Sequence, residues 1–259
     1  MRVACVEWPE GLSVDDTHWT AITRAIAAAR PELLVTNELP FGPWIAGSAA
    51  FSEDDAKRSI RAHEQGLEGL RALDLPAIVS SRPVWSGTRL ANEAFVLEAG
   101  TVRPLHRKQY FPNEPGWFES AWYEGDASGF AVAEVLGLKI GVLLCTEAMF
   151  NEHARAYGRQ GASLIVIPRA SGKDIAPWKT AGAMAALVSG AYAVSSNRSG
   201  GIFGGGGFAY APQGCFLAET NSTDPIRVID LDLNLPGFAQ RAYPCYVAEL
   251  DKDHAAPDR

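Results

Sequence analysis

The sequence lacks the short motifs that identify the common nucleotide-binding and hydrolytic sites. It contains no Gly-x-Ser-x-Gly turn, no Gly-x-Gly-x-x-Gly fingerprint, no Walker loop and no His-Glu-x-x-His pair. Its four cysteines form no Cys-x-x-Cys pair, which disfavours a thiol-based metal or redox protein. Lys and Arg number 23 against 30 for Asp and Glu, so neither a nucleic acid nor an anionic membrane is expected as the main partner.

Long apolar runs are also missing. The longest nearly uncharged window, 181–194, is too short and too rich in Gly, Ser and Ala to span a bilayer. The opening residues 1–7 are typical of a strand and lack the apolar stretch of a secretory signal. We therefore expect the cysteines to be free thiols in a cytoplasmic protein, because disulfides persist mainly in oxidising compartments.

What the chain does have is an alternation of strands and helices. It has 259 residues, of which 47% are apolar and 20% charged, as in an ordinary folded protein. Apolar periodicity predicts strands at 2–8, 33–38, 77–81, 91–98, 139–144, 163–167, 191–195 and 227–233, and helices at 15–30, 53–72, 151–160 and 178–189. This order predicts an α/β fold with a mixed sheet covered by helices. No linker composition divides the chain, so 1–259 is expected to be a single domain.

One long segment, 101–129, shows no sustained period. It carries Pro104, Pro112, Pro115 and Gly116. A structureless stretch of this length inside a compact domain usually serves a site. We therefore expect an irregular functional segment there.

Three reactive side chains stand at positions of interest. Glu38 ends a predicted strand, Lys108 lies in the irregular segment, and Cys145 ends an apolar strand before a turn and a helix. The carboxyl ends of strands in an open α/β sheet converge on a crevice, where reactive groups collect. Each residue also has an ordinary interpretation, because such a cysteine is usually a core residue and isolated Lys and Glu side chains are usually solvated.

Taken together, the surroundings of these residues resemble the nitrilase, or carbon–nitrogen hydrolase, superfamily. That family has an acid two residues after its nucleophilic Cys, a Glu seven on, an Arg ten on and Gly-Ala near the helix end. The matching residues here are Cys145, Glu147, Glu152, Arg155 and Gly161-Ala162. Glu38 resembles the strand-ending Glu of the family, and His106-Arg107-Lys108 resembles its Arg-Lys motif.

The resemblance implies a role for each residue. Cys145 forms a thioester, while Glu38 accepts the thiol proton, passes it to the leaving nitrogen and then activates water. Lys108 and the Thr146 N–H stabilise the oxyanion, and one such donor is typically worth ~3 kcal/mol. The Lys108 charge is expected to favour the ionised forms of Cys145 and Glu38. Glu114 resembles the second glutamate that many members carry after the Lys, and is expected to orient Lys108.

The residues around these positions are candidates for the walls of the substrate pocket. They are Trp117, Phe41, Phe150, Arg169 and Asn197. Arg169 or Arg198 is suited to bind a substrate carboxylate with two hydrogen bonds, since a guanidinium matches that geometry. A structural arginine is an equally good interpretation of either residue.

Departures from the family pattern leave the substrate open. Asn37 and Asn151 stand where Pro is common, and Thr146 stands where true nitrilases commonly have Trp. We therefore expect hydrolysis of a small non-peptide amide or N-carbamoyl compound. A nitrilase acting on a C≡N bond is the alternative within this fold, and a non-catalytic binding protein is the alternative of another class.

The resemblance also implies an architecture and partners. The expected fold is a four-layer α-β-β-α sandwich of two mixed sheets with outer helices. The expected protein needs a small-molecule substrate and no metal or organic cofactor. It is expected to form a homodimer or a higher homo-oligomer, with the C-terminal tail, about 236–259, as a candidate for dimer packing. Glu147, Glu152 and Arg155 are expected to form a structural ion-pair network beside the site.

Overall fold

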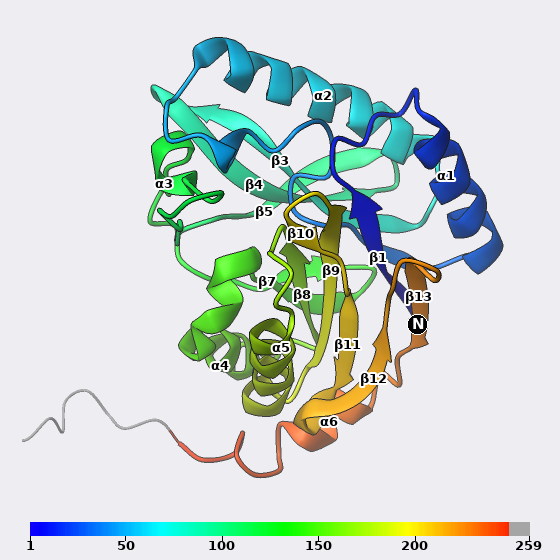
Figure 1. The fold of residues 1–259 in the computed structure, drawn as a ribbon. Helices are drawn as coiled ribbons and strands as arrows, with labels where there is room; N and C mark the ends of the chain where they lie inside the picture. Colours follow the sequence, from blue (N-terminus) through cyan, green and yellow to red (C-terminus); the bar gives the residue numbers. More distant parts are fainter. Residues whose placement is uncertain (249–259) are drawn as a thin grey trace, which may run out of the picture.

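Two β-sheets share one strand in the computed structural model, which describes residues 1–248 (Figure 1). The strand order is β5-β4-β3-β2-β1-β9-β8-β7-β6. β1 (Arg2–Pro9) pairs through its first part with β2 and β13, and through Glu7–Pro9 with β9. The other strands are β2 (Leu33–Val35), β3 (Ala77–Ser86), β4 (Arg89–Glu98), β5 (Thr101–Arg107), β6 (Ala133–Val135), β7 (Leu138–Val142), β8 (Leu164–Arg169), β9 (Tyr192–Gly200), β10 (Phe203–Gly204), β11 (Phe208–Ala211), β12 (Cys215–Glu219) and β13 (Ile226–Asp230).

Six of the central strands run in the same direction. β1 is parallel to both β2 and β9, β2 is parallel to β3, and β7, β8 and β9 are parallel to one another. β5 is antiparallel to β4, which is itself antiparallel to β3, so β5 shares that direction. The carboxyl ends of β2, β5 and β7 therefore lie at the same end of the two sheets.

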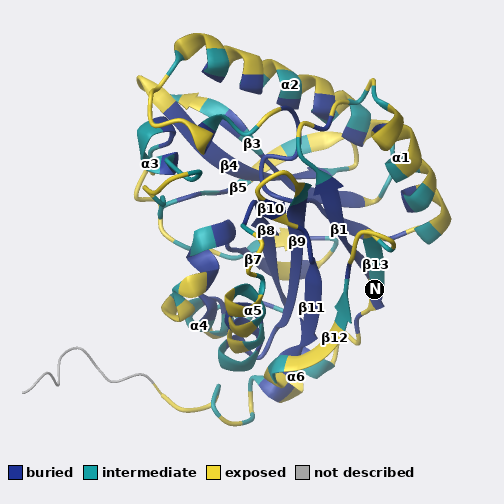
Figure 2. Cartoon of the chain, viewed as in Figure 1, coloured by how far each residue is buried: buried dark blue, intermediate teal, exposed yellow. Residues whose placement is uncertain are grey.

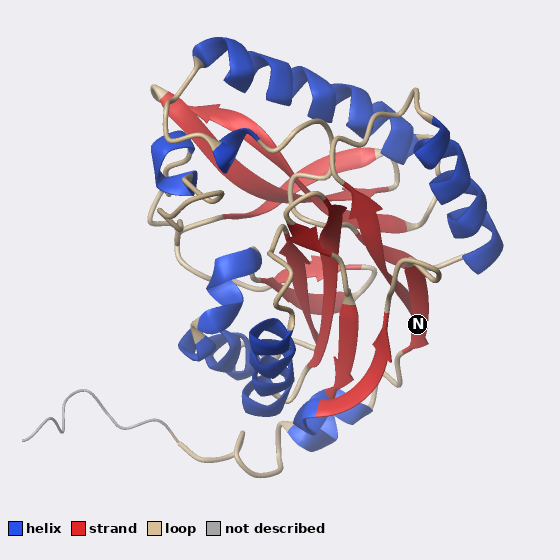
Figure 3. Cartoon of the chain, viewed as in Figure 1, coloured by secondary structure: helices blue, strands red, loops and turns tan. Residues whose placement is uncertain are grey.

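The sheets pack face to face on an apolar core. Val35 and Val79 from one sheet and Val142, Val166 and Val194 from the other belong to one buried cluster. The outer face of the first sheet packs against α1 (Thr17–Ala29) and α2 (Glu53–Arg71), and that of the second against α4 (Asn151–Arg159) and α5 (Ala176–Ser189). These layers confirm the predicted four-layer sandwich, whose exposed residues gather on the outer helices (Figures 2 and 3).

Capping explains where α1 begins and ends. The Asp16 carboxylate accepts a hydrogen bond from the Trp19 N–H (2.8 Å), which satisfies an N–H that has no carbonyl partner within the helix. At the other end Arg30 has a φ of 48°, and Pro31 follows. The helix therefore occupies the range that the sequence predicts.

Within residues 1–248, no helix combines the length and the apolar character needed to cross a membrane.

The prediction for 101–129 is wrong in part. This segment contains β5 and the short helix α3 (Glu119–Trp122). Pro104 concealed the strand in the sequence, because proline has no N–H to give to a sheet. β5 ends the strand order and is an edge strand, where a proline is tolerated. The helix expected at 151–160 is α4, which begins at Asn151 and has no side-chain cap.

Gly158→Ala should destabilise the contact between α4 and α5. A Cβ at Gly158 would lie 2.5 Å from the Ser189 carbonyl oxygen and 2.7 Å from its Cα. Backbone atoms cannot turn aside as a flexible side chain can, and overpacking of this kind costs about 1–3 kcal/mol. We expect a lower Tm in thermal unfolding followed by circular dichroism. Gly47→Ala is the control, since its nearest contact is 3.8 Å away; an equal loss in both variants would contradict the prediction.

Candidate active site

Glu38, Lys108 and Cys145 each follow a strand that ends at the same end of the sheets. Glu38 follows β2, and its N–H donates to the Arg169 carbonyl (3.1 Å). Lys108 follows β5, and its N–H donates to the Asn92 carbonyl (2.9 Å). Cys145 lies just beyond β7. The common strand direction thus brings together residues that are far apart in the sequence.

One buried ammonium joins this group. Lys108 Nζ lies 2.7 Å from Glu38 Oε1 and 2.6 Å from Glu119 Oε2, and all three side chains are fully buried. Cys145 is 2% exposed and close enough for Glu38 and Lys108 to shift its pKa. Buried charges are costly unless they are paired and hydrogen-bonded, so the charged side chains are stable only as a set.

Cys145 has an unusual backbone conformation. Its φ is 48°, in the left-handed region that residues with a Cβ rarely adopt. It is the first residue of the 3₁₀ helix η2 (Cys145–Met149). Such strain costs about 1–3 kcal/mol and persists where the surrounding structure enforces it.

Glu147 helps to hold the backbone at Cys145 in this conformation. Its buried carboxylate accepts hydrogen bonds from the Leu144 N–H (2.8 Å) and the Gln109 N–H (2.7 Å). His106 Nε2 lies 2.9 Å from the same carboxylate. Glu147 therefore connects the cysteine turn to the segment that carries Lys108, which agrees with the structural role expected for it.

The surroundings of Cys145 keep its thiol protonated. Burial is the main cause of its raised pKa, and the Glu38 carboxylate raises the pKa further. Lys108 and a backbone hydrogen bond from Ala170 lower the pKa by less. Lys108 therefore favours the thiolate, as expected, but burial and Glu38 outweigh its effect in the resting protein. Glu38 Oε2 is buried and has no hydrogen-bond partner within residues 1–248, so it is available to accept the thiol proton.

The second carboxylate on Lys108 is Glu119, which corrects the assignment of Glu114. Glu114 is exposed in a tight turn, where its backbone pairs with Trp117 (N to O, 3.1 Å). Proline follows Glu114 and helps to fix that turn at the surface. α3 begins a few residues later and places its first side chain, Glu119, inward. The sequence signal for this was an acidic residue between Phe118 and the apolar end of α3.

Glu119 has a strongly perturbed acidity. Burial raises its pKa, Lys108 opposes that effect, Glu38 adds to it, and the result is a pKa of about 7. Two carboxylates share a single ammonium here, so the fully ionised set carries one uncompensated negative charge. A proton on Glu119 relieves this charge.

The Arg169 guanidinium is hydrogen-bonded within the protein. Its guanidinium donates to Ser195 Oγ (2.7 Å), Ser171 Oγ (2.8 Å) and the Gly206 carbonyl (2.7 Å), and the side chain is fully buried. Binding a substrate carboxylate would require these bonds to break. The structural interpretation of Arg169 is therefore favoured over the predicted role in substrate binding.

The side chains of Arg198 and Asn197 are also hydrogen-bonded within the protein. Arg198 bonds to the Glu10 carboxylate and to two main-chain carbonyls. Asn197 accepts from the Ser171 N–H (2.9 Å) and donates to the Gly205 carbonyl (2.6 Å). Both side chains hold loops in place, and neither supports the predicted contact with substrate.

Phe41 also belongs to the core and not to a pocket wall. It is 2% exposed and packs against Trp8 and Trp19, with ring centroids 6.3 and 5.7 Å away. Its place beneath α1 and α2 follows from its neighbour Gly42, which turns the chain with a φ of 71°. The prediction for Phe41 is corrected accordingly.

Three other predicted wall residues remain candidates. Trp117 Nε1 donates to the carbonyl of Ala170 (3.0 Å), the residue whose backbone hydrogen bond reaches the Cys145 sulfur. Phe150 is half-buried and stacks on Tyr110 with ring centroids 4.1 Å apart. Thr146, next to the nucleophile candidate, is half-buried as well.

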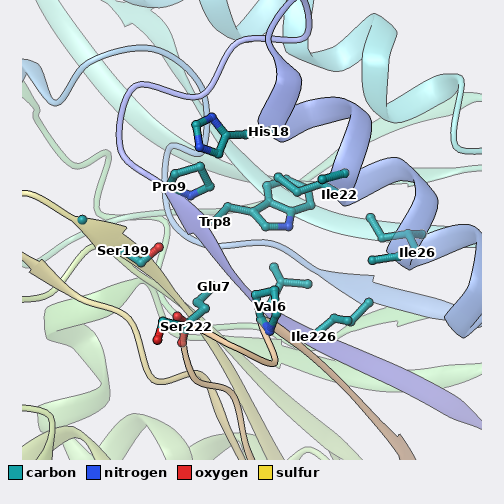
Figure 4. Close-up of a pocket in the computed structure, with 14 residues that line it drawn as sticks. Val6, Glu7, Trp8, Pro9, His18, Ile22, Ile26, Ser199, Ser222 and Ile226 are labelled. Atoms are coloured by element: carbon teal, nitrogen blue, oxygen red, sulfur yellow. The ribbon is translucent and has the colours of Figure 1, made fainter.

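An apolar pocket of about 360 Å³ lies apart from this cluster, between α1, β1 and β13 (Figure 4). Trp8, Ile22, Ile26 and Ile226 line it, whereas Glu38, Lys108, Glu119 and Cys145 do not. The pocket is therefore separate from the reactive cluster.

Among residues 1–248, no group of three or more His, Cys, Asp and Glu side chains is arranged to hold a metal ion.

Comparison with known proteins identifies relatives of this chain. The carbon-nitrogen hydrolase family model matches residues 69–243. An 84-residue stretch is 36% identical to an N-carbamoylputrescine amidase from Solanum tuberosum, covering 32% of this chain and 28% of that protein. The alignment thus spans less than a third of this curated relative.

Solved structures extend the likeness to the whole fold. A carbon-nitrogen hydrolase from Helicobacter pylori G27 is 20% identical, with a TM-score of 0.83 over 95% of this chain and 94% of that one. A variant of the amidase from Nesterenkonia sp. AN1 is 22% identical, with a TM-score of 0.77 over 95% and 94%. The active-site cysteine of that amidase carries the acetamide moiety of fluoroacetamide by covalent addition.

Glu119→Gln should change how stability depends on pH. A carboxyl group whose pKa is raised to about 7 from an ordinary 4.5 binds its proton more tightly in the folded state. Its stabilising contribution is complete below about pH 4.5 and is lost as the pH rises through about 7. The wild-type Tm minus the variant Tm should therefore be more positive at pH 5 than at pH 8. Exposed Glu114→Gln serves as the control, and a pH-independent difference for Glu119→Gln would contradict the prediction.

Proposed function

The chain belongs to the carbon-nitrogen hydrolase family, and from this premise we propose that it hydrolyses a small non-peptide amide or N-carbamoyl compound. The products are an acid and ammonia or an amine. One observation carries the proposal: a fixed ammonium, Lys108 Nζ, is bonded to a carboxylate, Glu38, that has one oxygen without a hydrogen bond and acts electrostatically on the buried Cys145 thiol. A nucleophile, a proton acceptor and a positive charge are the groups that amide hydrolysis needs.

In the first half of the reaction Cys145 attacks the substrate carbonyl carbon. The S–C bond forms as the thiol proton passes to Glu38 Oε2, so the thiolate never has to exist free in a buried site. The C–N bond then breaks, and Glu38 returns the proton to the leaving nitrogen. Ammonia or amine departs and leaves the acyl group on Cys145 as a thioester.

In the second half water replaces the nitrogen. Glu38 takes a proton from the water as its oxygen adds to the thioester carbon. The C–S bond breaks, the acid departs, and the proton returns to the Cys145 sulfur. Each half uses the same carboxylate first as base and then as acid, so the protein is restored without a cofactor.

Lys108 and the Thr146 N–H stabilise the negative oxygen in both halves. Thr146 is the second residue of η2, where an N–H has no earlier helical carbonyl to bond. Glu119 accepts a hydrogen bond from the same Lys108 ammonium as Glu38 and is a positioning residue. A preorganised donor of this type typically lowers the activation free energy by ~3 kcal/mol.

The substrate class is supported by the relatives and by the lining residues. The named relatives include an N-carbamoylputrescine amidase and an amidase whose cysteine carries a covalently added acetamide moiety. Trp117 and Phe150 offer aromatic surface for a small substrate. Thr146 in place of Trp disfavours the alternative of a nitrilase. Because Arg169 and Arg198 are bonded within the protein, a substrate carboxylate is not part of the proposal.

We extend the proposal to assembly and location. The whole chain is proposed to act as a single catalytic domain and to pair as a homodimer. Exposed aromatic side chains support pairing: Phe216, Phe238 and Tyr246 are 56%, 65% and 62% exposed. The predicted dimer tail, 236–259, lies outside the described residues beyond 248. A cytoplasmic location is supported by the four free cysteines.

Cys145→Ala should abolish turnover and leave folding intact. Ammonia release is measured with a panel of amides, N-carbamoyl compounds and nitriles, and Tm is measured in parallel. Loss of a nucleophile lowers kcat by on the order of 10⁴-fold or more, whereas Tm should stay nearly unchanged. Exposed Cys215→Ala is the matched control and should keep full activity. Intact mass should show an acyl adduct in wild type alone.

Two results would overturn this assignment. Unaltered ammonia release by Cys145→Ala would remove the thioester mechanism. Turnover of nitriles without amides would replace the amidase by the nitrilase alternative.

Light scattering should show a particle of twice the 27.8 kDa chain mass. Phe238→Glu places a charge on an exposed aromatic position and should shift the protein toward the monomer. Trp85→Glu is the control, because Trp85 is 43% exposed and belongs to β3, which lies far from α6 (Leu235–Ala239) (Figure 1). A wild-type protein that stays monomeric at milligram concentrations would refute the dimer.

A further inference from the structure

Asn92 lies at the centre of the reactive cluster. It belongs to β4, and its side chain is fully buried. Its Nδ2 donates to Glu38 Oε1 (2.8 Å), the same oxygen that accepts from Lys108 Nζ (2.7 Å). Its main-chain carbonyl accepts from the Lys108 N–H (2.9 Å). One residue thus contacts both the carboxylate and the lysine backbone.

We propose that Asn92 is a positioning residue that fixes the plane of the Glu38 carboxylate, so that one oxygen is held by donors and the other is free for the reaction. Two donors, Nδ2 of Asn92 and Nζ of Lys108, occupy Oε1 and leave Oε2 with no partner among the described residues. The inference rests on the proposed function, since Oε2 is the oxygen that takes the thiol proton. It assigns to Asn92 the orientation of the base and no proton transfer of its own.

Lys108 alone cannot fix this orientation. Its ammonium is shared with Glu119, and an ammonium is a compact point charge that accepts a carboxylate from many directions. A carboxylate can turn about its last bond and still keep an oxygen on such a charge. Nδ2 of Asn92 adds a second, directional contact, which fixes the plane of the carboxylate so that one of its two equivalent oxygens lies between both donors and the other has no partner.

A purely structural role for Asn92 explains less. Asparagine is depleted in strands, and burying its amide is costly without hydrogen bonds. The side chain makes one described hydrogen bond, to Glu38, and its Oδ1 is buried without a partner in residues 1–248. The amide therefore holds the carboxylate and does not brace the sheet.

The neutrality of the donor also fits the site. Glu38 interacts electrostatically with several ionisable groups around it. They include Lys108, Glu119, Cys145, Tyr123 and Arg169. A second cation in contact with Glu38 would weaken it as a base, and an added anion would increase the excess of negative charge. An amide N–H orients the carboxylate and leaves the net charge unchanged.

The test compares Asn92→Ala and Asn92→Leu with wild type and with Ser80→Ala. Leucine keeps the branched shape of asparagine and removes the donor without adding a charge, so it serves where alanine lowers Tm. Ser80 is an equally buried polar residue of the neighbouring strand, bonded to Thr36 Oγ1 (2.7 Å) and not to Glu38. The readouts are kcat and KM for the best substrate across pH, the rate at which iodoacetamide alkylates Cys145, and Tm.

We expect both Asn92 variants to lose about 10–100-fold in kcat with KM nearly unchanged, as is typical when a supporting hydrogen bond is lost. In Asn92→Ala the acidic limb of the kcat/KM profile should move to higher pH, because a carboxylate with one donor fewer takes up a proton more readily. Alkylation of Cys145 at pH 8 should slow in parallel. In that reaction an S–C bond forms, iodide leaves, and the thiol proton passes to Glu38. Ser80→Ala should keep wild-type values.

The outcomes separate this proposal from the proposed function. Wild-type kcat, acidic limb and alkylation rate in a folded Asn92 variant would overturn the role of Asn92. Losses equal to those of Ser80→Ala would also overturn it, because they would reflect general loosening of the sheet. If wild type turns over no substrate, the proposed function fails, and the alkylation rate of Cys145 still decides whether Asn92 positions Glu38.

Discussion

The buried contact of Lys108 with two carboxylates is the constraint on which the site depends. An ammonium and a carboxylate each lose several kcal/mol of hydration when they leave water, and only close pairing recovers it. Lys108 therefore cannot be buried without Glu38 and Glu119, nor they without it. Burial and the excess of one carboxylate together, against the opposing effect of Lys108, then explain why Glu119 has a pKa of about 7.

The two-sheet architecture is what makes this contact possible. β2, β5 and β7 run in the same direction, so the residues that follow them lie at one end of the sandwich. Glu147 then fixes the distance between the lysine segment and the cysteine turn through His106 and two backbone N–H groups. The site is thus built on strand ends that packing holds rigid, and the strained φ of Cys145 is maintained by the same bonds.

The burial of the thiol has a mechanistic consequence. A thiol with a raised pKa is inert until a base takes its proton, so in the proposed reaction the reactivity of Cys145 depends on the orientation of Glu38. This accounts for the two donors on the Glu38 carboxylate, from Lys108 and Asn92, and for the bond that holds the Glu38 main-chain N–H to the Arg169 carbonyl. The arginines contribute by holding loops, which leaves the substrate space to aromatic and small side chains.

The sequence by itself determined the alternation of strands and helices, the family, and the identity of Glu38, Lys108 and Cys145 as the residues to consider. Apolar periodicity and motif spacing carry that information because both are local properties of the chain. The tertiary structure decided that Glu119 and not Glu114 turns inward, that Phe41 and Arg169 serve the fold, and that Asn92 contacts Glu38. These facts depend on which way a side chain points and on what packs against it, and spacing along the chain does not specify either.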